Sequence, residues 1–124
     1  IRKYLKITDN FKQYSLNVIK EDINISCSVE RYLYLVAQAT IDRAEALIAY
    51  KKFRKPTTLS ENFNILFEEN IIDNDLQEKL VGMVGFRNVM AHDYDNVNYE
   101  IVYNIIHNRL DDINKFIKVV ESVI

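Results

Sequence analysis

Glycine, proline and cysteine are scarce in this chain of 124 residues, with two, one and one of each, and tryptophan is absent. Glycine and proline are the strongest helix breakers, so their scarcity favours long helices over short strands joined by tight turns. The single cysteine, Cys27, excludes an internal disulfide and any metal site built from several thiolates. It also favours a reducing compartment, so we expect a cytoplasmic protein.

Long apolar runs and an excess of basic charge are also lacking. No run approaches the roughly 18 apolar residues that a membrane-spanning helix needs, and the charged start at Ile1 to Tyr4 lacks the apolar segment of a signal peptide. The formal net charge is −2, whereas domains that bind nucleic acids are usually basic. An RNA-binding function would therefore require the basic groups to gather locally, for example in a cleft between two protomers.

The apolar residues that are present recur every three or four positions, which is typical of amphipathic helices. This spacing predicts long helices at about residues 2–24 and 28–53, and a last helix at about residues 98–123. A chain of this length can bury one hydrophobic core. We therefore predict one all-α domain over residues 1–124, an up-and-down bundle of four principal helices plus one short helix.

Capping residues predict where the remaining two helices begin. Thr58 and Glu61 have the spacing of a capping box, which indicates a short helix whose apolar residues, Phe67 among them, face inward. Asp73 or Asn74 can cap a fourth helix along the chain, which is also a long one. That helix leads into the segment with the most distinctive chemistry.

This segment runs from Phe86 to Tyr94 and reads Phe-Arg-Asn-Val-Met-Ala-His-Asp-Tyr, in a chain with only two histidines. The guanidinium of Arg87 is permanently charged and has a planar fork that suits phosphate. The imidazole of His92 can take up or release a proton near neutral pH. Together these side chains suit phosphodiester chemistry that needs no metal.

The spacing within the segment limits how its side chains can meet. Arg87 and His92 are five residues apart, about 140° around a helix, whereas Asn88 and His92 are four apart and can share a face. A common site therefore needs a long arginine reaching round, a helix that ends near His92, or a second protomer. We favour a helix end in a homodimer, because Gly82 and Gly85 would let another helix approach closely.

The pattern R-x-x-x-x-H-x-Y after a Met-Val-Gly-Phe lead-in resembles the HepT group of HEPN-domain toxins, the ribonuclease half of HepT/MntA toxin–antitoxin pairs. Similar residues extend over nearly the whole chain: Pro56, Glu61 to Phe63, Leu66, Ile71, Ile72 and Glu100 to Tyr103. The resemblance implies an all-helical HEPN-like fold. It also implies a metal-independent endoribonuclease whose substrate is tRNA or mRNA.

The resemblance further implies roles for individual residues. His92 would act as general base or acid while an RNA 2′-hydroxyl attacks its neighbouring phosphate, and Arg87 would stabilise the charge on the phosphate oxygens. An MntA-type nucleotidyltransferase antitoxin would attach AMP to Tyr94, and the added phosphate would neutralise Arg87 and repel RNA. Our own inference adds Asn88, which would orient His92 or donate a hydrogen bond to phosphate.

The densest basic run has two interpretations. Its cations are favoured at the C-terminus of a helix by the helix dipole, and they would also suit contacts with RNA phosphates. The run consists of Lys51, Lys52, Arg54 and Lys55. On the preceding helix, Asp42 would need a partner if it faced inward, and Arg87 is the partner we would expect.

No set of histidine, aspartate and glutamate has convincing metal-ligand spacing, so we predict neither a metal nor a cofactor, and we interpret His107 as a solvated residue. Two other functions remain open. A non-catalytic HEPN module could be a scaffold for a nucleotidyltransferase, with Arg87 and His92 holding the dimer together. The chain could also be a nucleotide-binding regulator that recognises a phosphate without cutting it.

Overall fold

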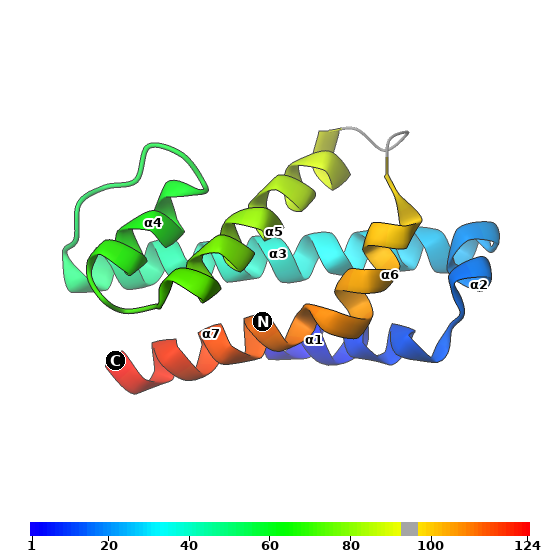
Figure 1. Cartoon of the computed structure of the whole chain (residues 1–124), viewed down its shortest axis with the longest axis horizontal. Coiled ribbons are helices and arrows are strands. Elements are labelled where there is room, and N and C mark those ends of the chain that lie inside the picture. Colours follow the sequence, from blue (N-terminus) through cyan, green and yellow to red (C-terminus); the bar gives the residue numbers. More distant parts are fainter. Residues whose placement is uncertain (93–96) are drawn as a thin grey trace.

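Helices are the only regular elements in the part that the computed structural model describes, residues 1–92 and 97–124, which confirms the all-α fold class. The elements are α1 (Arg2–Asp9), the 3₁₀ helix η1 (Asn10–Gln13), α2 (Leu16–Glu21), α3 (Ile23–Lys51), α4 (Glu61–Glu68), α5 (Asn74–His92), α6 (Tyr99–Asn108) and α7 (Leu110–Val123). α3 forms the long axis of the molecule; in Figure 1 α5 crosses it diagonally, α4 overlaps its left end, and α1 and α7 lie below it. No helix among these residues is long and apolar enough to cross a membrane.

α3 is the element against which most of the others pack, and its sequence contains no glycine or proline. It begins at an N-cap, Asp22, whose carboxylate accepts hydrogen bonds from the backbone N–H groups of Asn24 and Ile25 at 3.0 and 3.2 Å. Such a cap satisfies donors that the first helical turn leaves free. The helix ends at Lys51, and the C-cap residue Lys52 adopts a left-handed conformation with φ of 58°.

The predicted cap of α5 is confirmed, and that of α4 only in part, because the N-cap residue of α4 is Ser60 rather than Thr58. The hydroxyl of Thr58 accepts a hydrogen bond from the backbone N–H of Glu61 at 3.2 Å, at the start of α4. The carboxylate of Asp73 accepts from the backbone N–H of Leu76 at 2.8 Å, at the start of α5. α5 is then described as far as His92. Arg87 and Asn88 therefore lie in the last turns of a regular helix.

Two predicted long helices are each interrupted, so the count of four principal helices plus one short helix is wrong. The segment 2–24 is divided near Ser15, which is extended and caps α2 by accepting a hydrogen bond from the backbone N–H of Val18. The segment 98–123 is divided at Arg109. Asp111 and Asp112 lie in the first turn of α7, where negative charge favours a new helix start.

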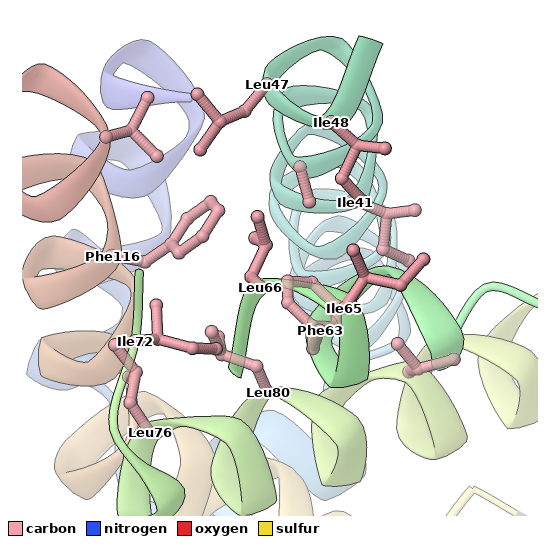
Figure 2. Packing of buried hydrophobic residues seen from close by; sticks show 13 residues of the cluster. Ile41, Leu47, Ile48, Phe63, Ile65, Leu66, Ile72, Leu76, Leu80 and Phe116 are labelled. Carbon is pink, nitrogen blue, oxygen red and sulfur yellow. The ribbon is translucent and has the colours of Figure 1, made fainter. Parts of the chain in front are cut away.

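The buried side chains form two clusters. The first lies between α3, α4, α5 and α7, and Figure 2 shows its side chains converging between these helices. Phe63 of α4 meets Phe116 of α7 edge to face, with ring centroids 5.8 Å apart. The second cluster joins α1, α2, α6 and the start of α7 to the N-terminal half of α3, and Met90 of α5 belongs to it. Met83 packs against both clusters.

Phe67, which was predicted to face inward, is exposed. It is 39% exposed, and Ile65 fills the inward position on α4 in its place. Ile101 is 50% exposed on α6.

Candidate functional site

The guanidinium of Arg87 is held at three points. Its Nε donates a hydrogen bond to Oε1 of Gln38 at 2.8 Å, and one terminal nitrogen donates to the hydroxyl of Tyr34 at 3.3 Å. The other terminal nitrogen donates to Oδ1 of Asn88 at 3.0 Å. The guanidinium carbon also lies 5.2 Å from the centroid of the Tyr34 ring, which is a cation–π arrangement. All three acceptors are uncharged oxygens.

The other residues of the segment are arranged differently. Asn88 and His92 are both exposed near the end of α5. Asn88 accepts a hydrogen bond from Arg87, and no hydrogen bond joins it to His92 within residues 1–92 and 97–124. Tyr94, the predicted site of AMP attachment, lies outside the described residues.

Asp42 does not face inward, so the predicted direct pairing with Arg87 is wrong. It is exposed on α3 and accepts a hydrogen bond from Nε2 of Gln38 at 2.8 Å. Because Asp42 lies one helical turn beyond Gln38, it reaches Arg87 only through this amide.

The basic run lies at the other end of the long helix. Lys51 and Lys52 end α3, about 20 Å along the helix from Gln38 at 1.5 Å per residue. The guanidinium of Arg54 contacts the carboxylates of both Glu61 and Glu68. This arrangement joins the end of α3 to α4, and of the run it leaves Lys51, Lys52 and Lys55 as candidates for RNA contact.

The ion pairs around Arg54 shift the pKa of each partner. Hydrogen bonds to Glu68 and Glu61 raise the pKa of Arg54. A hydrogen bond from Thr57, followed by that from Arg54, lowers the pKa of Glu61. The Arg54 hydrogen bond is also the main cause that lowers the pKa of Glu68. Arg54 is thus paired with carboxylates, whereas the acceptors of Arg87 within residues 1–92 and 97–124 are uncharged.

A hydrogen bond fastens the start of α6 to α3, beside the segment of the motif. The hydroxyl of Tyr99 donates to Oε1 of Glu30 at 3.0 Å. Burial, followed by the hydrogen bond to Glu30, raises the pKa of Tyr99. The N-terminal half of α3 therefore positions both chain segments that flank residues 93–96: α5 through Arg87 and α6 through Tyr99.

His107 is not solvated as predicted. It is half-buried in α6, its ring centroid lies 4.2 Å from that of Tyr103, and its buried Nε2 has no hydrogen-bond partner among the described residues. In the same part of the chain, no group of three or more His, Cys, Asp or Glu side chains is arranged to hold a metal ion.

One face of α5 is exposed and nearly free of large side chains. Gly82, Gly85, Val89 and His92 are all exposed, and their spacing of three or four residues places them on one helical face. A side-chain carbon added at either glycine would meet no atom within 4 Å. Gly82 also borders an open groove of about 480 Å³ between α3, α5, α6 and α7, to which the exposed Ile101 contributes.

The residues that sequence reasoning missed are Tyr34 and Gln38. Their signal was available, because Glu30, Tyr34, Gln38 and Asp42 follow one another at intervals of four along α3, and such residues share a face. The helix was predicted from its apolar stripe alone, and this second, polar stripe was not considered. Chemically, the arrangement can present a fixed cation to a phosphate, with an exposed imidazole nearby on the same helix.

Comparison with known proteins identifies the family. The chain matches the family described as ribonuclease HepT-like over residues 1–120. The mRNA nuclease HepT of Shewanella oneidensis is 31% identical over 103 residues, which cover 83% of this chain and 77% of that protein. The tRNA nuclease HepT of Aphanizomenon flos-aquae is 26% identical over 122 residues, which cover 98% and 83%.

A solved structure leads to the same group. The tri-AMPylated HEPN toxin of Shewanella oneidensis, in complex with MNT antitoxin, is 28% identical and superposes with a TM-score of 0.86 over 97% of this chain and 92% of that one. Family match, sequence identity and fold thus agree with one another, and the chain belongs to the HepT-like ribonuclease family.

Proposed function

We propose that this protein is the toxin of a toxin–antitoxin pair and cleaves tRNA or mRNA as a metal-independent endoribonuclease. Its two relatives are named as an mRNA nuclease and a tRNA nuclease. The observation that carries the proposal is the half-buried Arg87, which is fixed by three uncharged acceptors. A cation that is held in place and not neutralised by these partners can bind a phosphate and stabilise the charge that develops on it.

The proposed reaction requires a base, an acid and a phosphate-binding group. One His92 side chain takes the proton from an RNA 2′-hydroxyl, whose oxygen attacks the adjacent phosphorus. The bond to the 5′-oxygen breaks, that oxygen takes up a proton from a second His92, and a 2′,3′-cyclic phosphate remains. Arg87 holds the phosphate oxygens, and the amide nitrogen of Asn88, whose oxygen already accepts from Arg87, donates to the same group.

The second histidine would come from a second copy of the chain. The exposed face of α5 formed by Gly82, Gly85, Val89 and His92 suits a close helix–helix contact, because neither glycine is needed for space inside the protomer. Glycine within a helix costs about 0.5–1 kcal/mol relative to alanine. A homodimer that crosses on this face explains two glycines that the isolated fold does not require.

Covalent attachment of AMP would inactivate the proposed ribonuclease. A related HEPN toxin is tri-AMPylated and bound to an MNT antitoxin. By analogy, an MntA-type nucleotidyltransferase would attach AMP to Tyr94, two residues beyond His92 in the sequence. The added phosphates would occupy Arg87 and repel RNA. We assign residues 1–124 to one HEPN-type domain that works in the cytoplasm, where its RNA substrates are found.

The test is RNA cleavage in EDTA with purified, unmodified protein and a range of tRNAs and mRNAs. We expect wild-type cleavage that leaves 2′,3′-cyclic phosphate ends, and losses of at least 100-fold in His92→Ala. The matched control is His107→Gln, which changes the other histidine and should keep its activity. If the wild type cuts none of these RNAs, the catalytic proposal is wrong and a scaffold role takes its place.

A second measurement tests the switch. The protein is incubated with ATP and the partner nucleotidyltransferase, and intact mass spectrometry counts the AMP groups added. Wild-type protein should gain AMP and lose cleavage activity, and Tyr94→Phe should gain none and stay active. The same number of AMP groups on Tyr94→Phe would show that another residue is modified.

A further inference from the structure

A polar ridge on α3 lies behind the motif and has no role in the reaction described so far. It consists of Glu30, Tyr34, Gln38 and Asp42, each four residues from the next. Tyr34 and Gln38 contact Arg87, and Asp42 contacts Gln38. These side chains neither belong to the apolar core nor cap a helix. Hydrophobic packing therefore does not explain why they lie in a row along α3.

The contacts of the ridge determine which edges of the guanidinium remain open. An arginine side chain has five N–H donors in a fixed plane. Within residues 1–92 and 97–124, Arg87 donates three of these N–H groups: Nε–H to Gln38, one from a terminal nitrogen to Tyr34 and one from the other terminal nitrogen to Asn88. Within that part of the chain, one N–H on each terminal nitrogen remains for an anion, and the guanidinium carbon lies 5.2 Å from the centroid of the Tyr34 ring.

The orientation of the Gln38 amide is set by Asp42. An ionised carboxylate can only accept hydrogen bonds, so the amide end that faces Asp42 at 2.8 Å must be the nitrogen. The oxygen of the same amide is then turned toward Nε of Arg87. With the amide reversed, an N–H group would face the cation and the hydrogen bond would be lost. Asp42 thus selects the one amide orientation that holds Arg87.

The intervening amide also preserves the charge of the arginine. Arg54 shows the alternative, because its guanidinium contacts two carboxylates directly and is neutralised locally. At Arg87 the carboxylate of Asp42 acts through Gln38, which is uncharged. The arginine is therefore oriented without an ion pair from this ridge. A donor that is held in place before the reaction need not be ordered during it.

We propose that Gln38 and Asp42 are positioning residues for Arg87, with Asp42 acting through the amide of Gln38 and Tyr34 supporting the guanidinium plane. The effect is to present a fixed and still charged N–H edge to the phosphate of the substrate. This inference rests on the proposed ribonuclease function for its kinetic consequence. Its structural part concerns Arg87 alone and can be measured without RNA.

The first experiment observes Arg87 directly by ¹H–¹⁵N NMR of the arginine Nε–H groups, with the Arg87 signal assigned from its loss in Arg87→Lys. In the wild type the hydrogen bond to Gln38 should protect this proton from exchange with water. Asp42→Lys, which can only donate, should turn the amide round and abolish the protection. Asp42 is exposed, so the substitution leaves the core intact. Unchanged protection in Asp42→Lys would overturn the proposal.

The second experiment separates orientation from charge by kinetics. Gln38→Leu removes the acceptor and keeps the charge of Arg87, so kcat should fall about 10-fold or more, as for other lost hydrogen bonds to charged groups, with little change in KM. Gln38→Glu keeps an acceptor and neutralises Arg87, so KM should rise instead. The slope of log KM against log salt should become shallower by about one in Gln38→Glu.

A matched control excludes a general effect of such substitutions. Gln77 is another half-buried glutamine, and it bonds to Asn64 between α4 and α5, away from the motif. Gln77→Glu and Gln77→Leu should leave kcat and the salt slope unchanged. Equal losses in the Gln38 and Gln77 variants would make Gln38 merely structural and overturn the proposal. A wild type without ribonuclease activity would refute the proposed function, and the NMR result would still decide whether the ridge positions Arg87.

Discussion

Replacing both glycines of the exposed α5 face by alanine should have opposite effects on the protomer and on the dimer. An added side-chain carbon at Gly82 or Gly85 meets nothing within 4 Å in the protomer. Each substitution should therefore gain only the helix propensity of alanine, about 0.5–1 kcal/mol. The double variant should be more stable toward unfolding by about 1–2 kcal/mol, or about 3–12 °C in Tm for a domain of this size.

The same methyl groups should weaken a dimer that crosses on this face. Inserting a methyl into a close helix–helix contact typically costs about 1–3 kcal/mol, and in a two-fold interface each substitution occurs twice. The four methyl groups together should cost about 4–12 kcal/mol, so the dissociation constant of the double variant should rise about 1,000-fold or more. The stabilising effect within the protomer makes misfolding an inadequate explanation for such a loss.

Sedimentation velocity over a range of concentrations measures the dimerisation constant, and thermal unfolding at concentrations where the protein is monomeric measures protomer stability. Lys118→Ala on the exposed side of α7 serves as the control and should leave dimerisation unchanged. If the double glycine variant dimerises as tightly as the wild type, the α5 face does not form the interface. If the wild type is a monomer at micromolar concentration, the site shared by two protomers has to be abandoned.

Three further predictions follow from the described contacts. The pKa values of Glu61 and Glu68 are lowered from 4.5 in the folded state. Their stabilising effect is therefore present above that value and lost as the pH falls below it. Between pH 5 and pH 3, the free energy of unfolding measured in urea should fall less in Arg54→Gln than in the wild type. Phe116→Ala should lower the free energy of unfolding by about 3–5 kcal/mol in urea at neutral pH, since the side chain is fully buried. Because burial raises the pKa of Tyr99, the absorbance titration of the wild type should contain a phenolate that forms above the ordinary value of 10.0 and is missing in Tyr99→Phe.

Most of the fold follows from the sequence because the local signals are strong. The absence of glycine and proline over α3 and the caps at Thr58 and Asp73 predicted elements that the structure contains. The divisions of the first and last predicted helices were missed. At Ser15 and Arg109 the apolar spacing continues across the break, and periodicity alone cannot distinguish a continuous helix from two that pack on the same core.

The candidate residues could be named from the sequence, but the side chain that links Asp42 to Arg87 was not predicted. Arg87 and Asn88 were identified from their residue types and spacing, and they do contact each other. Asp42 was paired with Arg87 on charge alone, which overlooked the uncharged Gln38 that joins them. Pairing opposite charges is the simplest inference from sequence, but it conflicts with the requirement that a phosphate-binding arginine keep its charge.

The acidic balance of the chain is compatible with an RNA-cleaving site once the pairing of each cation is considered. Arg54 and Lys79 each contact two carboxylates, so they add little positive potential at a distance. Arg87 instead donates to three uncharged oxygens, and its charge is undiminished by these contacts. The net charge of −2 is a sum over the whole chain. The electrostatic force on a bound phosphate depends mainly on the cations that lie near it. If Arg87 binds phosphate as proposed, that one well-oriented arginine matters more to the contact than a basic surface would.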